Sequence, residues 1–250
     1  MELYSECQKI LCVDGSPNIS PTDFSIVQVQ RPKDLFNWAA AWEAGISAAK
    51  HDVLLYLDCD RVLPLDYLSH LYDRINDHTF FYSESLYQIK TNCSLQMVRG
   101  IRDNPDEHQR YIRIDNRAPH PPTWKTVQHS RTPMSGNVGF TKTAYKKSGG
   151  LDPTYEGWGY PDYDYYLQTY RQGYHFETIK GREFHLKHGY PNDKEFQFMN
   201  LWNAVKFCTK WNIKASVGMR ETAAGFSLQD PFMLLVYQSY NQAKEAVLAD

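Results

Sequence analysis

Two carboxylates separated by one residue follow an apolar run that is typical of a buried strand. The run from Val53 to Asp58 reads VLLYLD, and Cys59 and Asp60 come next. In extended backbone, residues two apart point the same way, so Asp58 and Asp60 can face one ligand. Two close carboxylates repel each other unless a cation or protons lie between them, and Mn²⁺ or Mg²⁺ on a diphosphate is a natural partner. The alternative is that Asp58 only ends the strand and Asp60 only caps the following turn, and that neither binds a ligand.

Another carboxylate ends an earlier apolar run. Asp14 follows Ile10–Val13 and precedes a Gly-Ser turn. In open α/β sheets, ligands bind beyond the carboxyl ends of the strands. Asp14 and Asp58 are therefore expected to share one cleft, where Asp14 would bind a base or ribose. A plain Asx turn is the alternative for Asp14.

The segments that must position these carboxylates alternate between strand and helix. Strands are expected at 10–13, 24–30 and 53–58, with a helix between the last two whose N-cap would be Asp34. The continuous apolar character of 53–58 is typical of a strand covered on both faces, so the sequence predicts a mainly parallel central sheet flanked by helices.

The second half of the chain is less regular. Residues 80–133 are expected to form mostly loops and short strands over a binding face, apart from a possible strand near 80–89. A strand at 138–141, a helix from Pro161 to Gln172 and a strand at 174–179 follow, the last leading into a loop at 181–192. We expect one domain over 1–250, with a nucleotide-binding part (1–79), an acceptor and catalytic part (80–192) and a helical tail (193–250).

Composition and charge are those of an ordinary globular protein. The chain has 250 residues, a net charge of −2 and 22% charged residues, which argues against a nucleic-acid partner. Its five cysteines form no C-x-x-C pair, which favours a reducing compartment. No signal peptide and no run of about 20 apolar residues is visible, so we expect a cytoplasmic location and no transmembrane segment.

Three stretches together carry a family resemblance. ILCVDGSPN, FNWAAAWEAGISAAKHDVLLYLDCDRVLP and GNVGFTKTAYKKSGGLDPTYEGWGYPDYDYYLQTYRQGYHF resemble a glycosyltransferase of the GT-A fold. The likeness is greatest to the family 2 enzymes and to the C-terminal module of galactosyl- and N-acetylgalactosaminyltransferases. That family opens with a further strand and helix, and the nine residues before Ile10 are too few to form both.

The resemblance implies a role for each carboxylate. Asp14 corresponds to the acid that contacts uracil. Asp58 and Asp60 correspond to the D-x-D motif, which holds the ribose and the metal-bound diphosphate of a nucleotide sugar.

The block Gly157-Trp158-Gly159 resembles the family loop that lines the sugar sites. Related enzymes read G-W-G-G-E-D where this chain reads GWGYPD, so Asp162 falls at the position of the catalytic base and Pro161 replaces the glutamate. A carboxylate at a helix N-terminus suits that role, because the helix dipole favours negative charge there. The alternative is that Asp162 or Asp164 only offsets the partial positive charge at the N-terminus of the helix.

Two histidines follow the last expected strand. Relatives place a histidine of the metal site there, which implies His185, with His188 as the second choice.

Taken together, these features predict a metal-dependent glycosyltransferase. It would move a sugar from a nucleotide donor, most simply a UDP-sugar, to a hydroxyl of a glycan or other acceptor with inversion, using Mn²⁺ or Mg²⁺. The alternative is a degenerate sugar- or nucleotide-binding module without turnover. A nucleotidyltransferase or hydrolase is disfavoured, because no glycine-rich or basic phosphate cradle lies near the D-x-D.

Overall fold

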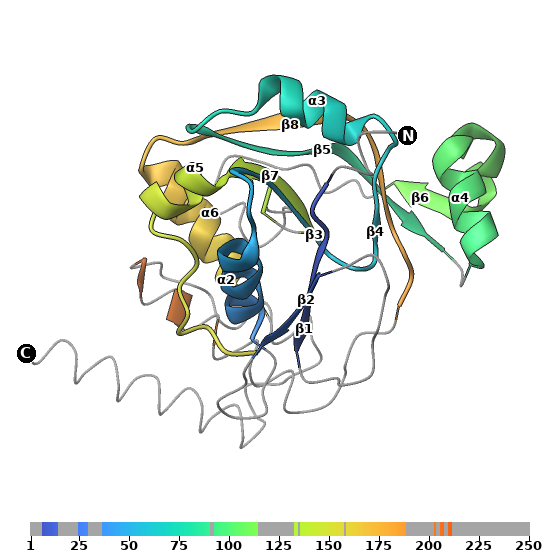
Figure 1. Cartoon of the computed structure of the whole chain (residues 1–250). Helices are drawn as coiled ribbons and strands as arrows, with labels where there is room; N and C mark the ends of the chain where they lie inside the picture. Colours follow the sequence, from blue (N-terminus) through green and yellow to red (C-terminus); the bar gives the residue numbers. More distant parts are fainter. Residues whose placement is uncertain are drawn as a thin grey trace, which may run out of the picture.

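The main sheet has six strands in the order β3-β7-β5-β8-β4, with β6 paired to β5 (Figure 1). The computed structural model describes residues 7–14, 25–29, 37–90, 93–114, 133–134, 136–157, 159–188, 203, 206–207 and 210–211. The strands of the main sheet are β3 (Val53–Leu57), β4 (Arg61–Val62), β5 (Thr79–Ile89), β6 (Ile112–Ile114), β7 (Asn137–Thr141) and β8 (His175–His185). A separate parallel pair consists of β1 (Ile10–Asp14) and β2 (Ser25–Val29).

The main sheet is mixed rather than mainly parallel. Among the described strands of this sheet, only β5 and β8 pair in parallel, whereas β7 runs antiparallel to both β3 and β5, and β4 runs antiparallel to β8. The expectation of a mainly parallel sheet is therefore not confirmed. The apolar run of β3 does not require parallel neighbours, and in the structure this strand is half-buried, with Leu57 exposed at its end.

Helices lie on both faces of the sheet (Figure 1). On the two faces lie α2 (Trp38–Ala48), α3 (Tyr67–Arg74), α5 (Lys142–Lys147) and α6 (Pro161–Arg171), whereas α4 (Leu95–Asp103) and η1 (Pro105–Tyr111) lie to one side, with β6. Successive residues of a strand point to opposite faces, and β5 shows this directly. Phe80 packs into an aromatic core with residues of α2, α5 and α6, whereas Phe81 packs against α3.

A small lobe projects from the end of β5, where the sequence predicts loops (Figure 1). It contains α4, η1 and β6. Ile101 and Ile112 pack there on Ile89 and Phe184, and the Ser94 side chain caps α4 by accepting from the Met97 N–H. The lobe is thus more regular than expected.

Two other expectations are corrected. The N-cap of α2 is Asn37 rather than Asp34, because the Asn37 side chain accepts the hydrogen bond from the Ala40 N–H at 2.8 Å. The last strand does not stop at 179 but continues as β8 to His185. Gly181 has a φ of +142°, and the register with β5 shifts between Ser83 and Ser85, which lets the strand pass an irregularity and go on pairing.

In the part of the chain that the structure describes, none of the helices is long and apolar enough to cross a membrane. The cytoplasmic location stays a prediction. Most of the expected tail at 193–250 lies outside the described residues, and four of those that are described, Asn203, Lys206, Phe207 and Lys210, are helical.

Candidate metal and catalytic site

The pairing of β4 with β8 brings the D-x-D motif to the two histidines. Arg61 is opposite His185 in the register, and the Leu186 N–H donates to the Asp60 carbonyl at 2.8 Å. Asp60 immediately precedes β4, so its side chain lies beside the end of β8. Residues 125 positions apart in the sequence, Asp60 and His185, are thereby placed in contact.

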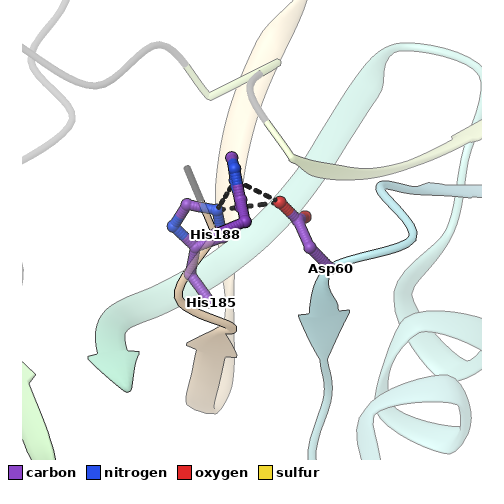
Figure 2. Close-up of side chains that lie close together, drawn as sticks. All are labelled: Asp60, His185 and His188. Atoms are coloured by element: carbon purple, nitrogen blue, oxygen red, sulfur yellow. Dashed lines mark hydrogen bonds and ion pairs between the residues drawn. The ribbon is translucent and has the colours of Figure 1, made fainter. Parts of the chain in front are cut away.

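Three side chains converge at this point (Figure 2). Asp60 Oδ2 lies 2.9 Å from His185 Nε2 and 2.8 Å from His188 Nε2, and the two Nε2 atoms are 3.1 Å apart. Each residue offers one ligand atom, and these atoms all lie within 4.8 Å of one another. The sequence left His185 and His188 as alternatives, and the structure brings both to Asp60.

The chemistry of this cluster fits a divalent cation. The Asp60 Oδ1 atom is buried without a hydrogen-bond partner among the described residues, although Arg61 Nε lies 3.7 Å away. Burial alone would raise the Asp60 pKa, but the hydrogen bond from His185 and the charges of His185, Arg61 and His188 lower it overall. A carboxylate and two imidazoles form a mixed oxygen and nitrogen donor set that suits Mn²⁺ and related transition metals.

Asp58 lies next to this cluster and is held from the opposite side. The Tyr56 hydroxyl donates to Asp58 Oδ1, and Trp38 Nε1 donates to the same hydroxyl at 2.7 Å. Burial raises the Asp58 pKa, partly offset by the Tyr56 hydrogen bond and the charge of Arg61. The pKa values of Asp58 and Asp60 are therefore shifted in opposite directions, and it is Asp60 that contacts the two histidines.

A buried polar network lies next to the cluster, and no motif in the sequence indicates it. Arg61 Nη1 donates to Glu183 Oε1 at 2.8 Å, and the Glu183 side chain is fully buried. Asn137 donates to the other Glu183 oxygen and to Ser83 Oγ, and accepts from the Tyr67 hydroxyl at 3.0 Å. The network joins β4, β5, β7, β8 and α3 next to Asp60.

Gly136 leaves the space that the Arg61 guanidinium occupies. Its φ is +91°, and a Cβ built there would lie 2.4 Å from Arg61 Cζ. We expect Gly136→Ala to destabilise the protein by about 2 kcal/mol or more, because a left-handed alanine costs about 1 kcal/mol and Arg61 must also move from Glu183. Chemical unfolding would measure this loss.

Gly173 provides the matched control for that substitution. Its φ is +85°, but nothing lies within 4 Å of a Cβ at this position. Gly173→Ala should therefore lose only the backbone contribution of about 1 kcal/mol. Equal losses at the two positions would show that Arg61 does not need the space at Gly136.

The predicted catalytic aspartate lies at the start of α6, after a turn of left-handed residues. Gly157, Gly159 and Tyr160 have φ values of 75°, 89° and 75°. Tyr160 is the N-cap of α6, Pro161 opens the helix, and Asp162 lies partly buried in its first turn. Gly157 forms an isolated bridge with Asn37, which joins this loop to the start of α2.

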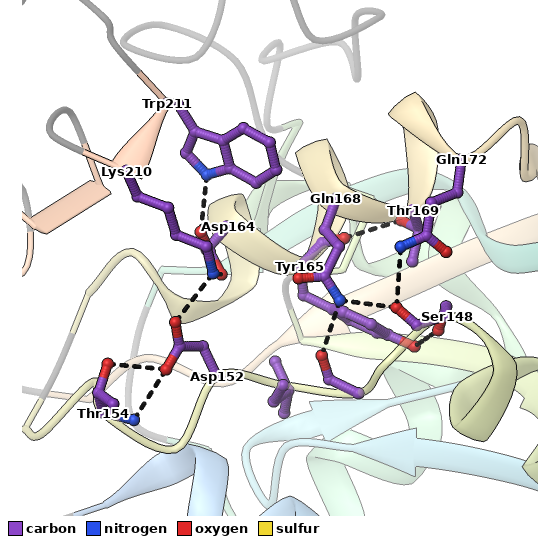
Figure 3. Close-up of polar contacts among 12 residues, drawn as sticks. Ser148, Asp152, Thr154, Asp164, Tyr165, Gln168, Thr169, Gln172, Lys210 and Trp211 are labelled. Atoms are coloured by element: carbon purple, nitrogen blue, oxygen red, sulfur yellow. Dashed lines mark hydrogen bonds and ion pairs between the residues drawn. The ribbon is translucent and has the colours of Figure 1, made fainter.

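Hydrogen bonds fix α6 to the turn that follows α5 (Figure 3). Gln168 donates to the Ser148 carbonyl at 2.7 Å and to the Gly150 carbonyl at 3.1 Å. The Ser148 and Tyr165 hydroxyl oxygens lie 2.7 Å apart in the core. These contacts set the axis of the helix that carries Asp162.

The two acidic residues of the first turn of α6 are in different environments. Asp164 is buried, with Oδ1 accepting from Trp211 Nε1 and Oδ2 accepting from Lys210 Nζ, each at 2.7 Å. Asp162 is partly buried, and among the described residues the cluster around Asp60 consists of Asp60, His185 and His188 without Asp162. The side chain of Asp14 and all of Trp158 lie outside the described residues.

Two family models match the chain. Residues 14–128 match the model described as glycosyl transferase family 2, and residues 120–189 match the model described as the N-terminal domain of galactosyltransferase. Together the matches run from the end of β1 past both histidines, and include the D-x-D and the GWG block. The chain is a GT-A-fold glycosyltransferase domain. The resemblance drawn from the sequence is thus confirmed.

This glycosyltransferase domain is similar to a solved structure described as the crystal structure of GalNAc-T7 with UDP, GalNAc and Mn²⁺. The TM-score is 0.49 and the sequence identity 14%, over 88% of this chain and 43% of that chain. The glycosyltransferase domain therefore spans less than half the length of that protein. A search of curated proteins returns no match.

Proposed function

We propose that this chain transfers a sugar from a UDP-sugar to a hydroxyl acceptor, with inversion and with the help of a divalent cation. The observation that carries the proposal is the Asp60, His185 and His188 cluster, which lies where β4 pairs with the end of β8 in a glycosyltransferase domain. Mn²⁺ beside UDP in the GalNAc-T7 structure is in keeping with it.

Asp60, His185 and His188 would hold the cation. When bound, a cation at this place neutralises the negative charge that develops on the departing diphosphate. The chain's own part is to keep the three donor atoms together, which the β4–β8 pairing and the buried Arg61–Glu183 contact support. Because two of the three donors are imidazoles, we expect Mn²⁺ to bind more tightly than Mg²⁺.

The remaining carboxylates would act on the two substrates, the nucleotide-sugar donor and the hydroxyl acceptor. Asp58 and Asp14 would hydrogen-bond the ribose and base of the nucleotide. Asp162 would take the proton of the acceptor hydroxyl as that oxygen attacks the anomeric carbon, so that the sugar inverts in a single displacement. Gly157, Trp158 and Gly159 would line the sugar site, as the family resemblance implies.

The decisive experiment is a calorimetric titration of UDP into the protein, with Mn²⁺ and with EDTA. Wild-type protein should bind UDP more tightly when Mn²⁺ is present, and Asp60→Asn should lose this dependence because the central donor of the cluster becomes a neutral amide. Asp73→Asn is the matched control, since Asp73 is an exposed carboxylate of α3. Equal UDP affinity in Mn²⁺ and in EDTA for the wild type would contradict the metal-dependent donor site.

A measurement of turnover distinguishes an active glycosyltransferase from a degenerate module that binds the donor without catalysis. The substitution of the family glutamate by Pro161 is the feature that favours a module without catalysis. Release of UDP from a panel of UDP-sugars, with simple glycosides as acceptors, would support transfer. Tight Mn²⁺-dependent UDP binding with no release from any donor would favour the binding module. The division into parts 1–79, 80–192 and 193–250 likewise stays a proposal.

A further inference from the structure

A helical face near the end of the described chain lies against the loop that leads to Asp162. Five residues form this face, which we name the clasp: Asn203, Lys206, Phe207, Lys210 and Trp211. Their spacing of three and four residues puts them on one side of a helix, and the Trp211 N–H donates to the Phe207 carbonyl at 3.1 Å. All five contact residues between Asp152 and Arg171.

Lys210 is the centre of the clasp (Figure 3). Its ammonium lies 2.8 Å from Asp152 Oδ2 and 2.7 Å from Asp164 Oδ2, so it bridges a residue before the GWG turn and a residue after it. Burial would lower the Lys210 pKa, but the hydrogen bonds and charges of the two aspartates raise it overall. The lysine therefore stays charged at neutral pH, between two carboxylates.

The other clasp residues contact both sides of the same turn. Asn203 is fully buried and donates to the Glu156 carbonyl at 2.8 Å, and Lys206 donates to the Thr154 carbonyl. On the far side, Trp211 donates to Asp164 and lies 4.6 Å from the Arg171 guanidinium, measured to the centre of its ring. Residues 157–162 are thus held at both ends by one helical face.

The turn itself contains a residue that needs such support. Tyr160 is a non-glycine residue at a φ of 75°, a conformation that persists only when surrounding contacts determine it. Its ring lies 5.5 Å from the Phe207 ring and 5.7 Å from the Tyr163 ring, and only 6% of the residue is exposed. Phe207 therefore packs directly on the residue that caps α6, two positions before Asp162.

From these contacts we infer that the clasp positions Asp162 for catalysis, with Lys210 as a positioning residue that acts through Asp152 and Asp164. The inference rests on the proposed function, because it assigns the clasp to the turnover of that site. It also gives Asp164 a role distinct from that of Asp162. Both oxygens of Asp164 are engaged by the clasp, whereas Asp162 is the residue whose placement the clasp secures.

The test compares Lys210→Met with two other variants in the full chain. Lys210→Met keeps the length and apolar stem of the side chain but removes its charge, and Lys210→Arg restores a cation. Lys147→Met is the matched control, since Lys147 is exposed in the last turn of α5. For each variant, kcat, the donor KM, Mn²⁺-dependent UDP affinity and amide hydrogen exchange of residues 155–162 would be measured well below the unfolding temperature.

Misplacement of the base should reduce kcat and leave donor binding unchanged. We expect Lys210→Met to lower kcat by about 10- to 100-fold and to speed exchange in residues 155–162, with KM and UDP affinity within about twofold of wild type. Lys210→Arg should recover part of the loss, and Lys147→Met should match the wild type.

The outcomes of these measurements distinguish a failure of the inference about the clasp from a failure of the proposed function. An active wild type whose Lys210→Met variant keeps full kcat would overturn the inference. A loss of UDP affinity equal to the loss of kcat would also overturn it, because it would indicate general loosening of the domain. A wild type that releases UDP from no donor would instead contradict the proposed function itself.

Discussion

Replacement of Asp162 by Asn is expected to lower turnover by about 10²- to 10⁴-fold, the range of general-base catalysis. The amide keeps the size and position of the side chain but cannot accept the proton of the acceptor hydroxyl. Because Asp162 is not a member of the Asp60 cluster, Mn²⁺-dependent UDP affinity should stay at the wild-type value. Single-turnover release of UDP, with calorimetry on the same preparations, would check both.

Asp164→Asn makes the sharpest comparison, since it changes an acidic residue of the same helical turn. Asp164 accepts hydrogen bonds from two clasp residues, so its variant should lose thermal stability through the weakened Lys210 contact. Asp162 would be a donor-site or structural residue, rather than the base, if its Asn variant lost UDP binding together with turnover.

Replacement of Glu183 by Leu is expected to destabilise the protein by about 3–5 kcal/mol. It would remove the nearer charged partner of the Arg61 guanidinium, whose side chain is only 8% exposed, and leave the carboxylate of Asp60, 3.7 Å from Arg61 Nε, as the remaining ion-pair partner. It would also remove an acceptor from Asn137. Denaturant unfolding followed by tryptophan fluorescence would measure the loss.

The double variant Arg61→Leu/Glu183→Leu isolates the contribution of the charge. Both variants lose the Asn137 contact equally, but the double variant leaves no guanidinium that lacks its nearer partner. It should therefore be more stable than Glu183→Leu alone, as is found when buried ion pairs are replaced by apolar residues. Greater loss in the double variant would mean that Arg61 stabilises the fold independently of Glu183.

The sequence predicted best those features that short motifs determine. Asp60 was identified as a ligand candidate from residue type and from its position after a strand, the family resemblance implied His185 with His188 as the second choice, and the structure brings the three side chains together. The helix from Pro161 was also predicted within one residue of its end, because proline and glycine mark its limits.

Features that depend on pairing between distant segments were not predicted. The direction of β7 relative to β3 and β5 is set by tertiary contacts, and the apolar pattern of a buried strand is the same in either orientation. The continuation of β8 through Gly181 was missed because GREFH has no strong apolar alternation, yet β4 and β5 both pair with it. The links from Arg61 to Glu183 and from Asp164 to Lys210 likewise connect residues far apart in the sequence.

The β4–β8 pairing also has a consequence for how the protein is made. A chain emerging from the ribosome exposes Asp58 and Asp60 more than a hundred residues before His185 has been added, as the 125-residue separation of Asp60 and His185 requires. Among the described strands β4 pairs with β8, so this short strand has no partner until β8 emerges. Contacts of such long range form slowly. The acidic motif is therefore translated early but gains its histidine neighbours late, after most of the domain has been synthesised.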